Sequence, residues 1–253
     1  MINDLASITS TSTEIVVHFI ALFFRMGAVM ALMPIFGQQA ISVRVRLALA
    51  VAFAFLIFPI IPATEVAPVP LITFGAEAVN GLAIGAFFRA FYFALQIAGT
   101  IIAQSSSLSQ IFGGPTVDPQ PAVGNLIIMA GMALAALSGI HIDFIGALVK
   151  SYTLFPIGVF PSPETLGELS VAHVLLTFEI AFTLSLPFLI AALIYNLALG
   201  IINKAMPQLM VAFVGAPAIT LGGLVILFLI LPLILNVWYQ AFYSYLQLPF
   251  EVF

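Results

Sequence analysis

The stretch IAALIYNLALGIINKAMPQLMVAFVGAPAITLGGL, residues 190–224, decides how the rest of the chain can fold. It joins two strongly apolar runs, yet it contains the polar residues Asn196, Lys204 and Gln208. Residues that interrupt helices are also frequent in it: Gly200, Pro207, Gly215, Pro217, Gly222 and Gly223. This pattern predicts that one helix ends here, a short amphipathic connection follows, and a second helix starts between Pro207 and Pro217. We call residues 196–217 the elbow.

The elbow cannot lie unprotected in lipid, because every backbone N–H and C=O group needs a hydrogen-bond partner there. It must therefore lie at the membrane surface, against protein or beside water. Pro207 lacks a backbone N–H, and Gly200 and Gly215 can adopt a positive φ. We therefore expect a helix break within residues 205–217, with Lys204 near an aqueous surface.

The composition is that of an integral membrane protein. Of the 253 residues, 63% are hydrophobic and 6% are charged, whereas a typical soluble domain has about 25% charged residues. No polar stretch is long enough to fold separately, so we expect one membrane-embedded domain over residues 1–253. The 24 Phe and 16 Pro favour an all-α chain whose helices are broken.

Several classes of chemistry are excluded by what the sequence lacks. Cysteine is absent, which excludes disulfides, thiolate metal sites and thiol nucleophiles. The three His residues are far apart, and the usual hydrolase, metalloprotease and phosphate-binding motifs are missing. The net charge of −4 argues against nucleic-acid binding. Residues 1–14 contain no Lys or Arg, so we expect no cleaved signal peptide. We expect neither catalysis, nor a metal, nor another cofactor.

Six apolar segments are candidate membrane helices, and a bilayer span needs about 20 residues. They occupy residues 15–36, 47–61, 71–103, 123–149, 171–202 and 209–246. The second is short. The third, fifth and sixth are long, and two interpretations remain open for them: over-length helices, or pairs of half-helices broken near Gly85, Pro187 and Pro232.

The first segment carries a polar stripe. Glu14, His18, Ala21 and Arg25 share one helix face at about 100° per residue. An Arg inside a membrane costs several kcal/mol unless it is paired or hydrated. The stripe therefore indicates either a Glu–Arg pair between two helices or a face that meets water or a partner subunit.

Other polar and small residues allow the same two interpretations. Glu77, Arg89 and Glu179 lie within apolar segments. Gly81 and Gly85, and likewise Gly131, Ala135 and Gly139, have the four-residue spacing of small residues that lets membrane helices approach closely. The partner helices could belong to this chain or to another one.

A polar loop, QSSSLSQIFGGPTVDPQP at residues 104–121, separates the third and fourth segments. Its apolar centre on a Ser-rich, turn-rich background would suit a plug in a water-filled passage, and a surface loop with a buried anchor is the alternative. The candidate plug residues are Ser105, Ser106, Ser107, Leu108, Ser109, Gln110, Ile111, Phe112, Gly113, Gly114, Pro115, Asp118 and Pro119.

Four patches, taken in order, resemble the FliR family of flagellar and type III secretion export-gate proteins. The first comprises Arg25-Met26-Gly27, Pro34, Phe36-Gly37, Val43 to Leu47 and Pro59. The second comprises Ala98-Gly99, Gln104, Leu108-Ser109 and Asp118-Pro119. The third comprises Ser138 to His141, Ser151 and Pro156-Ile157-Gly158. The fourth and most specific comprises Asn196 to Gly200, Lys204-Ala205, Pro207-Gln208-Leu209, Gly215 and Pro217. Ser106 and Ser107 stand where the family tends to have glycine.

The resemblance implies a subunit of a hetero-oligomeric complex in the bacterial inner membrane, at the flagellar basal body. Its expected partners are FliP-like and FliQ-like subunits, an FlhB-like subunit, unfolded export substrates and the lipid membrane. The implied fold is a set of helical hairpins with broken helices, FliP-like over about residues 1–185 and FliQ-like over about 186–253. The resemblance also matches residues 104–121 to the pore plug and the elbow to the entrance region.

Three functions follow from these observations. The first is a non-enzymatic core subunit of a flagellar protein export gate, which forms pore wall and plug. The second is a small-solute secondary transporter with a midplane site built from Glu77, Arg89 and Glu179. The third is a structural membrane scaffold. A transporter should show related halves, which are not visible here, whereas an export subunit should expose faces that only partners can cover.

Overall fold

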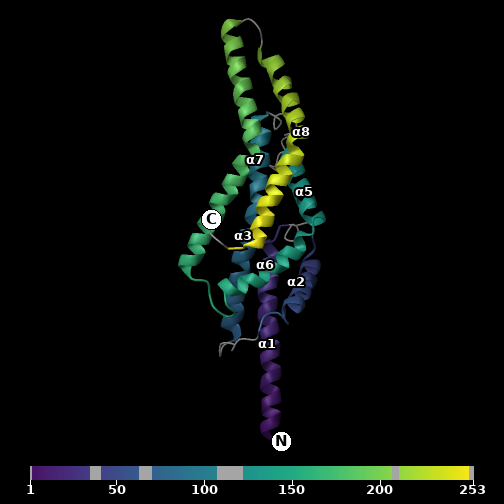
Figure 1. The fold of residues 1–253 in the computed structure, drawn as a ribbon, viewed down its shortest axis with the longest axis vertical. Helices are drawn as coiled ribbons and strands as arrows, with labels where there is room; N and C mark the ends of the chain where they lie inside the picture. Colours follow the sequence, from purple (N-terminus) through teal and green to yellow (C-terminus); the bar gives the residue numbers. More distant parts are fainter. Residues whose placement is uncertain (1, 35–40, 63–69, 107–121, 207–210, 251–253) are drawn as a thin grey trace. The chain divides into compact units, whose positions relative to one another are not determined.

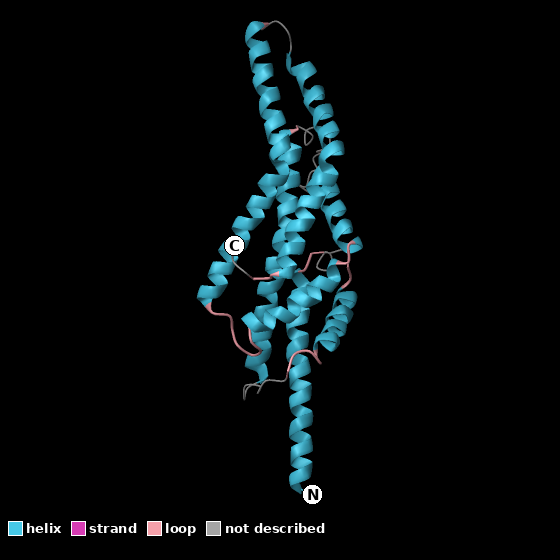
Figure 2. Ribbon diagram, in the orientation of Figure 1, coloured by secondary structure: helices cyan, strands magenta, loops and turns pink. Residues whose placement is uncertain are grey.

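The computed structural model describes residues 2–34, 41–62, 70–106, 122–206 and 211–250. The described residues form helices and loops, with no strand among them (Figures 1 and 2). In chain order the helices are α1 (Ile2–Leu32), α2 (Val43–Ile57), α3 (Pro70–Ser105), α5 (Ala122–Leu137), α6 (Ile140–Leu154), α7 (Pro163–Ala205) and α8 (Val211–Gln247). The all-α class predicted from composition is confirmed.

Among the described residues, four stretches are long and apolar enough to cross a membrane: Thr13–Leu32, Pro70–Ser105, Pro163–Ala205 and Pro217–Gln247. The pair α5 and α6 would make a fifth, broken span. The short segment at α2 has only 15 residues, or about 22 Å at 1.5 Å per residue, which is less than the thickness of a bilayer core.

The three long segments are over-length helices. Pro187 lies inside α7, and Pro217 and Pro232 lie inside α8, while Gly85 lies inside α3. A proline removes one backbone hydrogen bond and crowds the preceding turn. The helices nevertheless continue through all three prolines, so half-helices broken at Pro187 and Pro232 are excluded.

The fourth apolar segment contains two helices, whereas the sequence pattern suggested one. α5 ends at Leu137 and α6 begins at Ile140, and Gly139 between them has a φ of 76°. Only glycine adopts this left-handed conformation without a steric cost, so the break depends on Gly139. The expectation that Gly139 continues a small-residue packing face with Gly131 and Ala135 is therefore wrong.

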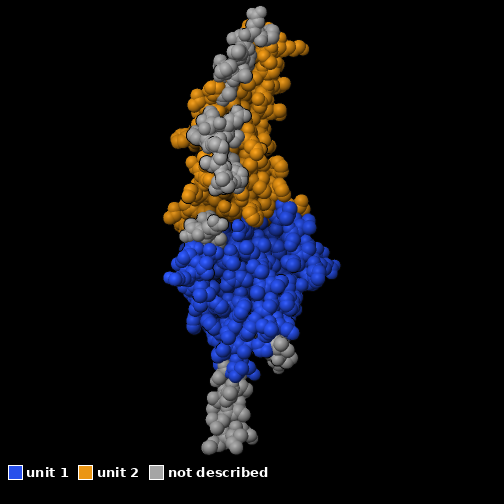
Figure 3. Space-filling view, turned by 180° about the vertical axis from the view of Figure 1, so that it is seen from behind, with its two compact units in different colours: residues 1–90, 139–174, 243–253 blue, residues 91–138, 175–242 orange. Residues whose placement is uncertain are grey.

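The chain divides into two compact units, coloured separately in Figure 3. Unit 1 comprises residues 1–90, 139–174 and 243–253, and unit 2 comprises residues 91–138 and 175–242. Both units are built from segments that are far apart in sequence, because α3, α7 and α8 each contribute to both. α7 also runs without interruption through residues 185 and 186.

The core of unit 1 is aromatic. Phe88 lies 4.4 Å from Phe144 between ring centroids, and Phe87 stacks on His173 at 4.2 Å. His173 is also hydrogen-bonded at Nε2 to the Tyr245 hydroxyl, 2.7 Å away. This cluster joins α3, α6, α7 and the end of α8 within the unit. Nothing in the local sequence pattern indicated it.

The core of unit 2 depends on close backbone approach. A Cβ on Gly99 of α3 would lie 2.5 Å from the Cα of Gly124 on α5, and a Cβ on Gly131 would lie 2.5 Å from Leu95 Cδ1. Trp238 of α8 is fully buried and donates its indole N–H to the Phe91 carbonyl at 2.9 Å. For Gly131, the packing predicted from sequence therefore occurs within the chain.

Candidate functional site

A fully buried ion pair connects α1 to α3 in unit 1. Arg25 Nε donates to Glu77 Oε2 at 2.7 Å, and Arg25 Nη2 donates to Glu77 Oε1 at 2.9 Å. Both side chains have no solvent exposure. Two parallel N–H···O bonds to a carboxylate are the strongest arrangement available to an arginine. Of the two interpretations of the polar stripe, the Glu–Arg pair between two helices therefore describes Arg25.

Arg25 and Glu77 also make hydrogen bonds to other parts of the chain. Arg25 Nη2 donates to the Phe155 carbonyl at 2.8 Å, and the guanidinium lies 3.8 Å from the centre of the Tyr152 ring. Glu77 Oε1 accepts the backbone N–H of Gly158 at 3.0 Å. Gly158 has a φ of 75°, which only glycine adopts readily. The pair therefore also fixes the chain that follows α6.

Small residues on α3 bring the two helices close enough for this pair. A Cβ on Gly81 would lie 2.5 Å from the Arg25 carbonyl oxygen, and a Cβ on Gly85 would lie 3.1 Å from that of Val29. The four-residue glycine spacing thus packs α3 against α1 within the chain. Asn80, one turn after Glu77 on α3, donates to the Val159 carbonyl at 2.9 Å.

The other polar residues singled out from the sequence are not gathered at this pair. His18 is buried, and its Nε2 donates to the Ile61 carbonyl at 3.1 Å. Glu14 is exposed on α1, and Arg89 is half-buried on α3 in unit 1. Glu179 is exposed on α7 in unit 2. The sequence pattern therefore identified one polar pair and several separate positions.

Only the start of the candidate plug lies within the described residues. Ser105 is the last residue of α3 and donates its hydroxyl to the Ile102 carbonyl at 2.9 Å. Ser106 follows in a turn, with its N–H also bonded to Ile102, and only 4% of it is exposed. The remaining candidates lie outside the described residues: Ser107, Leu108, Ser109, Gln110, Ile111, Phe112, Gly113, Gly114, Pro115, Asp118 and Pro119.

The elbow contains a helix break within the predicted range, since α7 ends at Ala205 and α8 begins at Val211. Asn196, Gly200 and Lys204 are exposed near the end of α7. Lys204 lies in the last turn, where a positive charge interacts favourably with the helix dipole. Pro207 and Gln208 lie outside the described residues.

Gly215 does not have the positive φ suggested for it, because it is inside α8 and its conformation is helical. Gly200 is likewise helical within α7. What requires a small residue at 215 is close packing: a Cβ there would lie 2.9 Å from Leu199 Cδ1. The Tyr195 hydroxyl donates to the Gly215 carbonyl at 2.7 Å, which joins α7 to α8 beside the elbow. Pro217 follows within α8.

No metal centre is formed by the described residues. Within them, no three His, Asp or Glu side chains lie close enough together to hold a metal ion. The geometry therefore offers a buried structural ion pair, a hydrogen bond that joins α7 to α8 beside the elbow, and a buried end of α3. Each is suited to positioning helices.

The family model described as bacterial export proteins, family 1, matches residues 16–245 of this chain. The flagellar biosynthetic protein FliR of Caulobacter vibrioides is 33% identical over 246 residues, which cover 94% of this chain and 98% of that protein. The protein of the same name from Aquifex aeolicus is 28% identical over 249 residues, or 96% of both chains. That of Escherichia coli is 28% identical over 221 residues, or 83% of this chain and 82% of that one.

The match to the family model spans nearly all the described helices, from within α1 to within α8. The relatives are matched over most of their own length as well. These matches support a role in flagellar export for a membrane protein that is not an enzyme. The chain belongs to the FliR family of bacterial export proteins.

Proposed function

We propose that this chain is a core subunit of the flagellar type III protein export gate, where it forms part of the pore wall and supplies the plug for the passage of unfolded flagellar subunits. It would act in the bacterial inner membrane at the flagellar basal body. Family membership supports the export role. The observation that carries the subunit role is the large apolar surface of α7.

That surface is too long for lipid alone to cover. In the most apolar stretch of α7 only 11% of residues are buried, compared with 50% for α3. Exposed large apolar residues run along α7 from Leu175 to Ile201. This distance is about 39 Å at 1.5 Å per residue, whereas the hydrocarbon core is about 30 Å thick. The usual tilt of about 20° shortens it only slightly. We infer that other membrane subunits cover part of α7.

The chemistry of the surface suggests the kind of partner. Small-residue and apolar faces favour close packing against other apolar helices. We propose FliP-like and FliQ-like subunits as these partners, together with an FlhB-like subunit. In this proposal residues 1–185 act as a FliP-like part and residues 186–253 as a FliQ-like part. Glu179 is an exposed carboxylate among apolar neighbours on α7, so it is a candidate to pair with a cationic side chain of a partner.

The alternative of a small-solute transporter has less support. Its expected binding group Glu77 already accepts hydrogen bonds from Arg25 Nε, Arg25 Nη2 and the Gly158 N–H. Both carboxylate oxygens are engaged and buried, so they offer no open acceptor to a solute. Glu179, on α7, is exposed.

Purification of the tagged full-length chain from native membranes tests the subunit role. We expect small membrane proteins to co-purify in fixed ratios through detergent extraction and size exclusion. A chain that is monodisperse by itself at native expression levels, with export unaffected by its deletion, would overturn the proposal.

A second experiment tests the plug separately. Deletion of residues 111–115 in the assembled complex should raise the ion conductance of membranes, because an apolar constriction excludes ions by dewetting. Assembly should be retained. If the deletion complex assembles and the conductance stays at the wild-type level, the loop is not the seal.

A further inference from the structure

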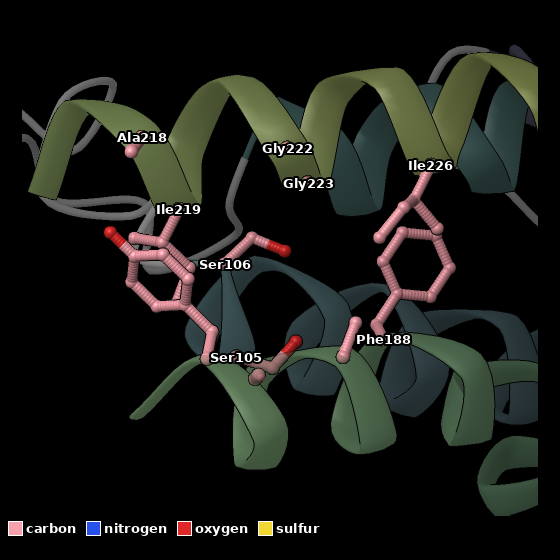
Figure 4. A pocket seen from close by; sticks show the side chains of 11 residues that line it. Ser105, Ser106, Phe188, Ala218, Ile219, Gly222, Gly223 and Ile226 are labelled. Atoms are coloured by element: carbon pink, nitrogen blue, oxygen red, sulfur yellow. The ribbon is translucent and has the colours of Figure 1, made fainter. Parts of the chain in front are cut away.

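The end of α3 is in unusually close contact with α8 in unit 2. Figure 4 shows Ser106 directed toward the part of α8 that carries Gly222 and Gly223. A Cβ on Gly223 would lie 2.6 Å from both Cβ and Oγ of Ser106. Real Cβ atoms do not approach other atoms this closely, so residue 223 must be glycine for Ser106 to stay where it is. The adjacent Gly222 is exposed and has nothing within 4 Å of its Cβ position.

A second contact holds the same two helices together. Trp238 of α8 donates its indole N–H to the Phe91 carbonyl of α3 at 2.9 Å. The two contacts are fifteen residues apart on both helices, from Phe91 to Ser106 and from Gly223 to Trp238. α3 and α8 are therefore antiparallel in a constant register over about 22 Å. The Ser106–Gly223 contact ends this register at the last turn of α3.

There is space beside the contact into which Ser106 could move. A cavity of about 120 Å³ is lined by the end of α3 and by small and apolar residues of α7 and α8. Its lining residues are Ser105, Ser106, Phe188, Ala191, Ala192, Tyr195, Ala218, Ile219, Gly222, Gly223 and Ile226. A methyl group on residue 223 can thus displace the end of α3 toward this cavity without unfolding the helices.

We propose that Ser106 and Gly223 form a positioning contact that fixes the C-terminal end of α3 against α8. This inference rests on the proposed function, because the candidate plug begins at Ser105. The contact sets where that segment leaves the helix, and it links the position of α8 to the start of the plug.

The first experiment measures the position of residue 106 without reference to export. The chain has no cysteine, so Ser106→Cys introduces a single thiol. In the assembled complex this thiol should react slowly with a maleimide, because Ser106 is buried. Adding Gly223→Ala should raise the labelling rate roughly tenfold, as expected from overpacking strain of ordinary size. Adding the matched Gly222→Ala should leave the rate unchanged. Equal rates in the three variants would overturn the contact.

The second experiment measures ion conductance and secretion of flagellar subunits for Gly223→Ala, Gly222→Ala, Ser106→Gly and the double variant Ser106→Gly/Gly223→Ala. We expect leakage from Gly223→Ala and, to a smaller extent, from Ser106→Gly, because each removes the contact. Gly222→Ala should not leak, and the leakage of Gly223→Ala should be reversed in the double variant. The reversal is the readout that a general packing defect would not give. Leakage from Gly222→Ala as well, or no rescue by Ser106→Gly, would overturn the positioning contact.

The two experiments distinguish failure of this inference from failure of the proposed function. If Gly223→Ala exposes the thiol at residue 106 while conductance stays at the wild-type level, the positioning contact stands and the plug is wrong. If the deletion of residues 111–115 leaks while Gly223→Ala changes neither labelling nor conductance, the plug stands and the contact is wrong.

Discussion

Replacement of Glu77 by Gln should destabilise the chain by about 3–5 kcal/mol, because it leaves the Arg25 guanidinium buried without a counter-charge. Gln has nearly the shape of Glu, so the substitution removes charge with little change in packing. Arg25 and Glu77 both have no exposure, so water cannot solvate the remaining cation without local opening.

The structure places the expected loss toward the lower end of that range. Glu77→Gln removes the charge from contacts at 2.7 and 2.9 Å with Arg25 and from the 3.0 Å bond with the Gly158 N–H. The guanidinium keeps the Phe155 carbonyl and the Tyr152 ring. A Gln oxygen in the place of Glu77 Oε1 can still accept from Arg25 Nη2 and from the Gly158 N–H. A loss near 3 kcal/mol is therefore expected.

The assay is thermal unfolding of the detergent-solubilised complex, followed by the fraction that remains monodisperse in size exclusion. Glu164→Gln is the control, because Glu164 is an exposed carboxylate in the first turn of α7. It should unfold like the wild type. A double replacement, Arg25→Met with Glu77→Met, should recover much of the loss, since removal of both charges leaves none buried and unpaired.

Two outcomes would refute this reasoning. Wild-type thermal stability of Glu77→Gln would show that water or another group compensates the buried arginine. A double replacement that is as unstable as Glu77→Gln would show that the lost hydrogen bonds, and not the unpaired charge, are responsible.

Three further predictions follow from other contacts. Trp238→Phe should lower the free energy of unfolding by about 0.5–1.5 kcal/mol, the usual value of one hydrogen bond, and an unchanged melting temperature would contradict the role of the bond to Phe91. Gly81→Ala should reduce the yield of folded protein in size exclusion, because the new Cβ would meet the backbone of α1. Gly27→Ala is the control, because a Cβ there would have nothing within 4 Å, and equal yields of the two variants would count against the helix contact at Gly81. Glu179→Lys should reduce co-purification of partner subunits by charge repulsion, and Glu179→Gln should have a smaller effect. Undiminished co-purification of both variants would show that no partner cation meets Glu179.

Much of the architecture was predictable from local pattern. Apolar segments of the right length identify membrane helices, because the side chains of a helix decide whether it is more stable in lipid or in water. The break at the elbow was predicted from several Gly and Pro residues close together in residues 196–217, whereas Pro187 and Pro232, each without such neighbours, do not interrupt α7 or α8. The family was also recognisable from the order of short motifs.

Local pattern failed where a residue serves more than one purpose. Gly131 and Gly139 are both glycines, each four residues from Ala135. Gly139 nevertheless interrupts the helix with a φ of 76°, whereas Gly131 packs against Leu95. Gly215 was expected to have a special backbone conformation, and its small size is what the packing uses. A glycine in a sequence does not reveal whether its backbone freedom or its lack of a side chain is needed.

The sequence by itself determined that this chain is helical, that it belongs in a membrane, and which faces carry polar groups. Only the tertiary structure decided which groups meet. Arg25 and Glu77 are 52 residues apart, and His173 and Tyr245 are 72 residues apart. Helical periodicity decides on which side of its own helix a side chain lies, and this is a local property. The choice of partner depends on how close two helices can approach, and at the Arg25–Glu77 pair Gly81 and Gly85 of α3 set that distance.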